Sequence, residues 1–474
     1  MKRNALIVIL CLFSLFFADR AIASEPRSWT TPDKLTYQPL PFKPQQAQRL
    51  VMENGIILYI LEDHELPLVN VSAVFRAGSA YDPADKAGLA ELTARMIRTG
   101  GTQMVNGNVV DDTLAFYGIS LDFSTETDFA SAHLSALKQN WIVGFDLFSQ
   151  MLMRPAFEEK KLQLAKDLLI EELRGVVDEP SKFAFREFRK LLYRGNPRGN
   201  LTTPSSIKTI QRLDLIDFHK RFFYPHNIMI TITGDITPAI AVETVRRYFG
   251  SWQVPGKTEK IPPPSSREDR LIYHIQKDIP QSVIIAGRFS PSKKGSDFYP
   301  FTVLDFILGS GGFQSRIFQE VRSNRGLAYS TGSFYRARDE YGVFGAYAIT
   351  KSSSTTEVLS LLRTIIGDMK DKGVRGSELA WAKKSLNNSF IFSFQSVDQI
   401  AYQQMMIEYD TLPQNFLSTY RKKIGEVSEE DINHTAARYF TSQNFVTLVL
   451  GNETAFDKPV LLVLPYQNAQ GEWV

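Results

Sequence analysis

The fold is decided by the stretch RFFYPHNIMITITG at residues 221–234, which returns as RYFTSQNFVTLVLG at residues 438–451. The two copies align without a gap, and arginine, phenylalanine, asparagine and glycine coincide between them. Each copy is typical of a helix end, a turn at asparagine and an apolar strand that ends in glycine. At the same offset upstream, Asp214 matches Asp431, near which we expect each helix to begin. The sequence therefore predicts an internal duplication.

The chain length and one segment define the domain organisation. With 474 residues, the chain exceeds what one hydrophobic core usually serves. Residues 254–269, VPGKTEKIPPPSSRED, include three consecutive prolines that favour an extended spacer. This linker separates two halves of similar size. We therefore predict two related domains, at residues 40–253 and 270–462.

Each half begins with β-rich segments and continues with helical patterns. Strands are expected at residues 55–62, 68–75, 271–275 and 281–289. Helices are expected at residues 87–99, 137–153, 158–177 and 298–308. Strands at both ends with helices between them predict an α+β fold, in which each duplicated domain is a largely antiparallel sheet with helices packed on one face.

The N-terminus has the pattern of a secretory signal peptide at residues 1–23. Lys2 and Arg3 form a positive region, an apolar run follows, and Ala21 and Ala23 place small residues before a cleavage site. The alternative is an uncleaved membrane anchor, but the apolar run is short for a bilayer. We therefore predict a secreted, periplasmic protein that has no membrane attachment after cleavage.

Composition excludes several other functions. The only cysteine, Cys11, leaves with the signal peptide, so the mature chain has no disulfide or thiol chemistry. Cleavage also lowers the formal net charge from +3 to +1, because Lys2, Arg3 and Arg20 leave together with Asp19. A nearly neutral chain without a long basic run gives no electrostatic reason to expect nucleic-acid binding.

Two further stretches carry a resemblance to a known family. Residues 54–96 predict a strand, a turn, a second strand, a Gly-Ser loop and a helix that contains GLAELTARM at residues 88–96. Residues 311–334 read GGFQSRIFQEVRSNRGLAYSTGSF. Together they resemble the pitrilysin/insulinase family of zinc peptidases, and the resemblance extends over about residues 40–460.

The resemblance implies that two of the three metal ligands of the family and its general base are missing, while the third ligand is retained. In the family, the helix carries two histidines that bind zinc and a glutamate that acts as general base. Here the first histidine position is Glu91 and the second is Arg95. The glutamate position is Ala94. The third zinc ligand falls on Glu172, whereas a supporting glutamate falls on Ala165. Because zinc needs three protein ligands, we predict no zinc in this chain and no peptide hydrolysis by the chain alone.

The missing metal leaves a place for a different interaction. Glu91 precedes Arg95 by four residues, the favourable order for an ion pair on a helix. We hypothesise that the Arg95 guanidinium takes the place of zinc and pairs with Glu172 and also with Glu91. The alternative is that all three are ordinary solvated charges.

The second half retains a substrate motif of the family. There, an arginine and a tyrosine seven positions apart donate hydrogen bonds to substrate, and the tyrosine also donates to the developing oxyanion. The matching residues are Arg322 and Tyr329. The alternatives are a surface salt bridge for Arg322 and a half-buried strand residue for Tyr329. The glycines at 309, 311 and 312 indicate a turn, since no Gly-Lys-Ser/Thr follows them.

The resemblance implies a function shared between two chains. In two-chain members of the family, one subunit carries zinc and the other carries the arginine and tyrosine, and this sequence resembles the second kind. We therefore predict a non-catalytic, substrate-binding subunit of a heteromeric zinc endopeptidase acting on peptides, with zinc in a homologous partner. Two alternatives stay open. One is a metal-free scaffold or peptide-binding protein, and the other is a stand-alone zinc enzyme with unrecognised ligands.

Overall fold

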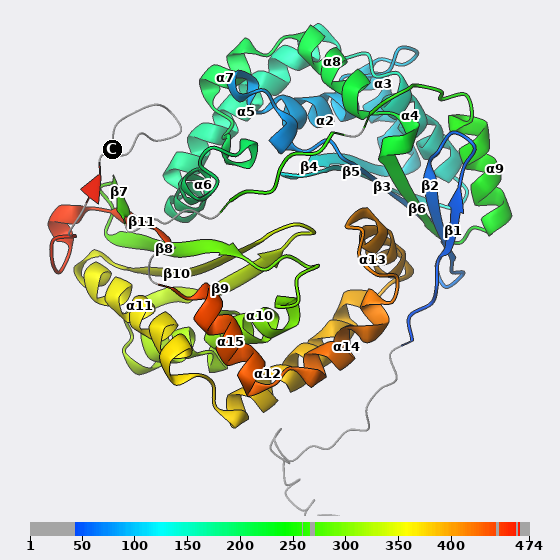
Figure 1. The fold of residues 1–474 in the computed structure, drawn as a ribbon. Coiled ribbons are helices and arrows are strands. Elements are labelled where there is room, and N and C mark those ends of the chain that lie inside the picture. The colour runs from blue at the N-terminus through cyan, green and yellow to red at the C-terminus, as the bar shows by residue number, and fades with distance from the viewer. Residues whose placement is uncertain (1–42, 258, 266–270, 442–444, 461–462, 465–474) are drawn as a thin grey trace, which may run out of the picture. The chain divides into compact units, whose positions relative to one another are not determined.

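The computed structural model describes residues 43–257, 259–265, 271–441, 445–460 and 463–464. Two six-stranded sheets organise these residues, one in each half of the chain (Figure 1). The first sheet has the strand order β1 (Gln48–Val51), β2 (Ile57–Glu62), β6 (Ile228–Gly234), β3 (Leu68–Phe75), β5 (Ala130–Leu137), β4 (Ser120–Thr125). The second has the order β12 (Val463–Leu464), β7 (Ile272–Gln276), β11 (Val446–Gly451), β8 (Gln281–Ser290), β10 (Gly342–Lys351), β9 (Ala328–Ala337).

Five strands of each sheet share one topology, whereas the edge strands differ, because β1 pairs antiparallel with β2 and β12 pairs parallel with β7. In each, the strand that ends the repeated stretch, β6 or β11, lies between a parallel neighbour and an antiparallel neighbour. The hairpin strands β5 and β4, like β10 and β9, pair antiparallel beyond it. This arrangement confirms the α+β prediction of largely antiparallel sheets, and the shared order supports the duplication.

Each half contains a set of helices that covers one face of its own sheet, with the exception of α6 and α13. In the first half they are α2 (Leu89–Thr99), α3 (Gly107–Tyr117), α4 (Trp141–Met153), α5 (Glu159–Asp178), α6 (Pro180–Leu192), α7 (Pro204–Thr209), α8 (Arg212–Phe222) and α9 (Pro238–Phe249). In the second they are α10 (Phe298–Asp305), α11 (Thr355–Lys372), α12 (Gly376–Ser389), α13 (Val397–Tyr409), α14 (Phe416–Glu426) and α15 (Glu429–Tyr439). Apolar side chains of α2, α4 and α8 form one core with strands of the first sheet, and those of α10, α11 and α15 do the same on the second.

The repeated helices α8 and α15 begin in the same way. Asp214 lies at the third position of α8 and accepts a hydrogen bond of 2.8 Å from the backbone N–H of Gln211. Asp431 lies at the third position of α15 and accepts one of 2.8 Å from the backbone N–H of Ser428. Each aspartate thus satisfies an N–H group that the helix leaves unpaired. The prediction that these helices begin near the two aspartates is confirmed.

One helix of each half packs on the sheet of the other half. Phe188 of α6 belongs to a buried cluster with Ile285 of the second sheet, and Met405 of α13 belongs to a cluster with Val74 of the first. Figure 1 shows α6 beside β8 and β11, and α13 beside β6. The helices α6 and α13 correspond to each other at the offset that relates the two repeats. The second face of each sheet is therefore covered too, and the two halves form one compact unit.

Some predicted features lie elsewhere than expected or outside the described residues. The helix predicted at residues 298–308 is α-helical only to Asp305 and continues as a π-helical turn at Phe306–Ser310. The signal peptide at residues 1–23 and the turn at Asn444 lie outside the described residues. In the part of the chain that the structure describes, no helix combines the length and apolar character needed to cross a membrane.

Candidate functional site

The helix α2, which carries the altered metal motif, is held at its N-terminus by a buried carboxylate. Asp82 accepts hydrogen bonds of 2.8 Å from the backbone N–H groups of Gly88 and Ala90. Gly88 has a φ of +104°, a conformation that favours glycine, and this residue leads the chain into the helix. Burial raises the pKa of Asp82 to about 7, although these hydrogen bonds oppose the shift. This arrangement fixes the direction in which α2 presents Glu91 and Arg95.

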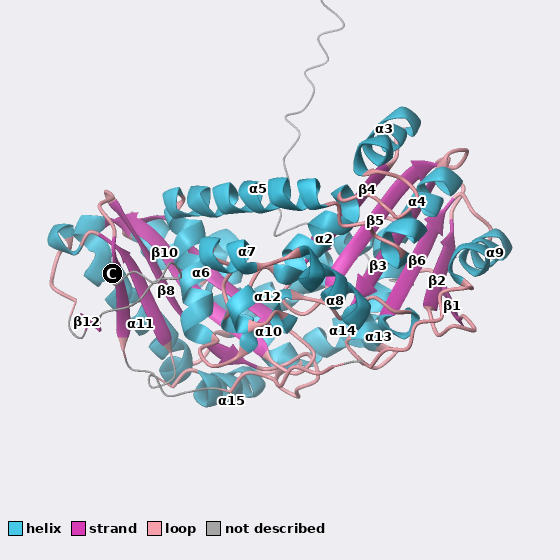
Figure 2. Ribbon diagram, turned by 90° about the horizontal axis from the view of Figure 1, so that it is seen from above, coloured by secondary structure: helices cyan, strands magenta, loops and turns pink. Residues whose placement is uncertain are grey.

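The Arg95 guanidinium bridges α2 and α5, which lie side by side (Figure 2). Its two terminal nitrogens donate hydrogen bonds of 3.0 and 2.8 Å to the two carboxylate oxygens of Glu172. The Glu91 carboxylate lies 3.9 Å from the same guanidinium. Ala94 of α2 is buried, and its methyl side chain contributes no polar atom. The ion pair hypothesised from the sequence is therefore present, as a two-pronged contact with Glu172 and a longer one with Glu91.

The charges around Arg95 influence one another. Burial raises the pKa of Glu91; Arg95 opposes this shift, and the neighbouring Glu172 carboxylate adds to it. The hydrogen bonds to Glu172 raise the pKa of Arg95. A permanently charged guanidinium thus lies between two carboxylates, where a metal cation would otherwise balance them.

These residues do not fit a zinc ion. Zinc takes nitrogen, sulfur or oxygen ligands that carry a free lone pair, whereas a guanidinium has none to offer. Both oxygens of Glu172 accept hydrogen bonds from Arg95, which leaves Glu91 as the other carboxylate. Across the described residues, no group of three or more histidine, cysteine, aspartate or glutamate side chains is placed to hold a metal.

Arg322 and Tyr329 lie together on the surface of the second half. Arg322 belongs to a π-helical turn, Phe318–Asn324, and Tyr329 is the second residue of β9. The Arg322 guanidinium carbon lies 5.6 Å from the centre of the Tyr329 ring and 5.1 Å from that of Phe318. The Tyr329 side chain is 77% exposed, so it is not the half-buried strand aromatic of the alternative interpretation.

Neither polar group of this pair bonds to another side chain or backbone group that the structure describes. Among the described residues, neither the Arg322 guanidinium nor the Tyr329 hydroxyl has a hydrogen-bond or ion-pair partner, which removes the salt-bridge alternative for Arg322. Phe313 is 74% exposed and packs edge-on against Phe318, with ring centres 4.9 Å apart. The pair therefore offers donors to an external group beside an exposed aromatic surface.

A half-buried ion pair anchors the segment that carries Arg322, and sequence reasoning missed it. Arg316 donates hydrogen bonds of 2.9 and 2.7 Å to the Glu378 carboxylate on α12. Although burial opposes the shift, the hydrogen bonds from Arg316 and from the Arg375 backbone lower the pKa of Glu378 to about 2. The only sequence signal was an arginine inside the quoted motif, and its partner lies 62 positions away.

Glycines allow the backbone conformation around the motif that contains Arg322 and Tyr329. Gly312 and Gly326 have φ values of +70° and +61°, which favour glycine, and Gly326 lies between Arg322 and Tyr329. A Cβ atom on Gly309 would come within 2.4 Å of the Ser333 backbone nitrogen. One π-helical turn precedes Gly312 and a second contains Arg322. Such turns are frequent at functional sites.

The two sets of predicted residues form separate sites. No hydrogen bond or ion pair between described residues joins Arg322 or Tyr329 to Arg95 or Glu172. The first set is an internal ion pair between two helices, and the second is an exposed pair of donors on a sheet edge. The second pair is therefore the candidate functional site.

Comparison with protein families identifies the class of protein. The family described as "Insulinase (Peptidase family M16)" matches residues 59–204, and the family described as "Peptidase M16 inactive domain" matches residues 209–386. The two matches follow one another along the chain, and the second begins within the first half, just before α8, and extends into α12 of the second half. The chain belongs to the pitrilysin/insulinase (M16) peptidase family, as a non-catalytic member.

Individual proteins agree with this assignment. An "Uncharacterized zinc protease YmxG" of Bacillus subtilis is 21% identical over 85% of this chain and 98% of its own length. A "Non-peptidase homolog YmxG" of Helicobacter pylori is 25% identical over 84% of this chain and 92% of its own. The crystal structure of a peptidase M16 inactive domain from Pseudomonas fluorescens has a TM-score of 0.80 and 23% identity, covering 88% of this chain and all of that one. The periplasmic protease PqqL from Escherichia coli has a TM-score of 0.72 and 16% identity, covering 88% of this chain and 47% of that one.

Proposed function

We propose that this chain is the non-catalytic, substrate-binding subunit of a heteromeric zinc endopeptidase that acts on peptides. In this proposal Arg322 and Tyr329 act in trans at the zinc site of a homologous partner. The observation that carries the proposal is that both side chains are exposed and adjacent but have no polar partner in the described part of the chain. Exposed hydrogen-bond donors of this kind can bind an acceptor group of another molecule.

The chemistry of the pair suits acyl transfer. Hydrolysis of a peptide bond develops negative charge on the carbonyl oxygen, and prearranged donors lower the barrier by stabilising that charge. The Arg322 guanidinium supplies several donors in a fixed plane, and the Tyr329 phenol supplies one more. The ion pair between Arg316 and Glu378 holds the segment in place, so the donors are positioned before substrate arrives.

The proposal assigns zinc and hydrolysis to the partner. In this chain Arg95 pairs with Glu172 at the position that the resemblance assigns to zinc, so the proposal takes the water-activating chemistry from a subunit with an intact zinc helix. A signal peptide at residues 1–23 and a periplasmic location belong to the same proposal. The location is supported by the fold that the chain shares with a periplasmic protease.

The test uses the complex of this chain with a partner that bears the zinc motif. Arg322→Ala and Tyr329→Phe are each expected to lower the kcat of peptide cleavage by about 100- to 1,000-fold, the loss typical of a missing oxyanion donor. Arg336→Ala is the matched control, because Arg336 is an exposed arginine on the same strand. If both substitutions leave turnover equal to that of the control complex, the proposal is refuted.

The second candidate is a metal-free scaffold or peptide-binding protein. It is supported by the name of the Helicobacter relative, a non-peptidase homolog, and by the replacement of the metal site with an ion pair. This candidate predicts that peptide binds to the chain alone, and that a complex forms without acquiring any cleavage activity. Peptide binding measured by fluorescence anisotropy, together with the cleavage assay, separates the two candidates.

A further inference from the structure

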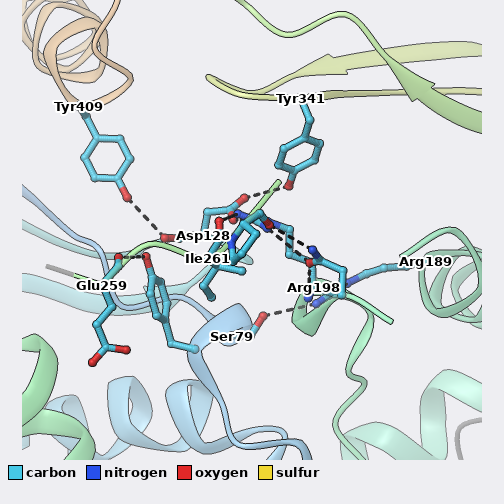
Figure 3. A network of polar contacts seen from close by, with 11 residues as sticks. Ser79, Asp128, Arg189, Arg198, Glu259, Ile261, Tyr341 and Tyr409 are labelled. Carbon is cyan, nitrogen blue, oxygen red and sulfur yellow. Dashed lines mark hydrogen bonds and ion pairs between the residues drawn. The ribbon is translucent and has the colours of Figure 1, made fainter. Parts of the chain in front are cut away.

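The turns of two equivalent hairpins meet where the halves of the chain join. Asp128 lies in the turn between β4 and β5, and Tyr341 lies in the turn between β9 and β10. The Tyr341 hydroxyl donates a hydrogen bond of 3.2 Å to the Asp128 carboxylate, which also pairs with Arg198 at 2.7 Å (Figure 3). The Tyr409 hydroxyl of α13 donates one of 3.4 Å to the Asp128 backbone carbonyl. Three separate parts of the chain are thus held around Asp128, two through its carboxylate and one through its backbone carbonyl.

The linker between the two halves is hydrogen-bonded to residues in the same region. Arg198 donates a hydrogen bond of 2.8 Å to the Pro262 carbonyl, and the Tyr81 hydroxyl donates one of 3.2 Å to the Glu259 carbonyl. These contacts hold the backbone on either side of Lys260. Lys260 lines a cavity of about 210 Å³ together with residues of both halves.

The carboxylates that line this cavity are nearly all neutralised. Asp128 pairs with Arg198, and Glu259 pairs with Arg221. The other pairs join Asp410 to Lys293 at 2.6 Å and Asp339 to Lys294 at 3.7 Å. Glu340 alone has no cationic partner in the described part of the chain, and it is exposed to solvent.

Three cations in the cavity have no carboxylate partner among the described residues: Arg76, Lys260 and Arg338. Arg76 stacks 4.1 Å above the Tyr409 ring and donates a hydrogen bond of 2.6 Å to the Tyr409 carbonyl. Arg338 is half-buried, and neither it nor Lys260 has a polar side-chain partner in the described part of the chain. Three unpaired positive charges around one small cavity attract an anion, because the cavity walls screen them less than bulk water does.

We propose that this cavity binds a small oxyanion, a phosphate or a di- or tricarboxylate, which pairs with Arg76, Lys260 and Arg338. A cavity of about 210 Å³ has room for such an anion and several waters, since a water takes roughly 30 Å³ of liquid volume. The three cations come from the first half, the intervening segment and the second half. A bound anion therefore links all three, and the folded chain gains stability that rises with the logarithm of the anion concentration above its dissociation constant.

The experiment measures binding of inorganic phosphate and of citrate to the full chain by calorimetry, with ionic strength held constant by sodium chloride. Saturable binding of one anion per chain is expected, for at least one of the two probes. Arg338→Gln and Lys260→Gln are each expected to weaken that binding by about tenfold or more, the usual effect of removing a hydrogen bond to a charged group. Arg336→Gln removes the same charge two positions from Arg338 but outside the cavity, so it should leave affinity unchanged.

Lys260 keeps the test independent of folding, because its side chain is exposed and contacts no polar partner among the described residues. If neither anion binds saturably to the unmodified chain, the proposal is overturned. It is equally overturned if Lys260→Gln and Arg338→Gln bind the anion as tightly as Arg336→Gln does.

Discussion

Replacing Glu91 and Arg95 with histidine is expected to rebuild a zinc site between α2 and α5. The Arg95 guanidinium lies 2.8 Å from Glu172 and 3.9 Å from Glu91, so side chains at these three positions converge on one point. A histidine ring and its bond to zinc extend about as far from the backbone as an arginine side chain does. Zinc would therefore take the place of the guanidinium, with two imidazoles and the Glu172 carboxylate as ligands.

The magnitude follows from exposure and from binding linkage. The ion pair that the substitutions remove has side chains that are 26% and 55% exposed, so its loss costs about 1 kcal/mol or less. Zinc at about 100 times its dissociation constant adds about 2.7 kcal/mol to the free energy of unfolding. The double variant should therefore be slightly less stable than the natural chain without zinc, and more stable by roughly 2 kcal/mol with it.

The assay combines zinc stoichiometry after dialysis with urea unfolding in zinc and in chelator. One zinc per chain is expected for Glu91→His combined with Arg95→His, and none for the natural chain. Adding Glu172→Gln to the double variant removes the third ligand and serves as the control. The reasoning is refuted if the double variant binds zinc no more tightly than this control, because α2 and α5 would then not hold the geometry of a metal site.

Two further predictions concern the fold. Phe188→Ala, in the helix exchanged between the halves, should lower the free energy of unfolding by about 3–5 kcal/mol, because this ring is buried against the opposite sheet. Phe116→Ala, at a side chain 83% exposed, should change it by less than about 0.5 kcal/mol in the same urea titration, and equal effects would contradict the packing. Asp305 is buried and its pKa is raised to about 6, so the native state binds its proton more tightly than the unfolded state does. Relative to Asp305→Asn, the free energy of unfolding should therefore fall by about 2 kcal/mol as the pH rises from about 4 to about 6, and parallel pH profiles would contradict the prediction.

The duplication was predictable because its signals are local. A helix end, a turn and a buried strand each depend on residues close together in sequence, and the pattern recurs at one offset. The structure repeats it as α8 followed by β6, and as α15 followed by β11. The strand at Leu68–Phe75 was predicted to the residue for the same reason, since alternation and the bounding turns define it.

The exchange of α6 and α13 between the sheets was not predictable in this way. Helix α6 has a strongly apolar face, but such a face indicates only that the helix packs against something. Which sheet it covers depends on the path of the chain between α5 and α7. The π-helical ending of the helix at residues 298–308 was missed as well, because an extra residue in a turn leaves the apolar pattern almost unchanged.

The sequence by itself determined the repeated halves, the family resemblance and the replacement of metal ligands by Glu91, Ala94 and Arg95, since these are properties of residue identity and spacing. Only the tertiary structure decided that Arg95 takes both oxygens of Glu172, and that Arg322 and Tyr329 are adjacent without a polar partner among the described residues. It also decided that cations from three distant segments share one cavity. The physical reason is that a contact between remote residues depends on how whole elements pack, and packing is a property of the assembled fold rather than of any short stretch.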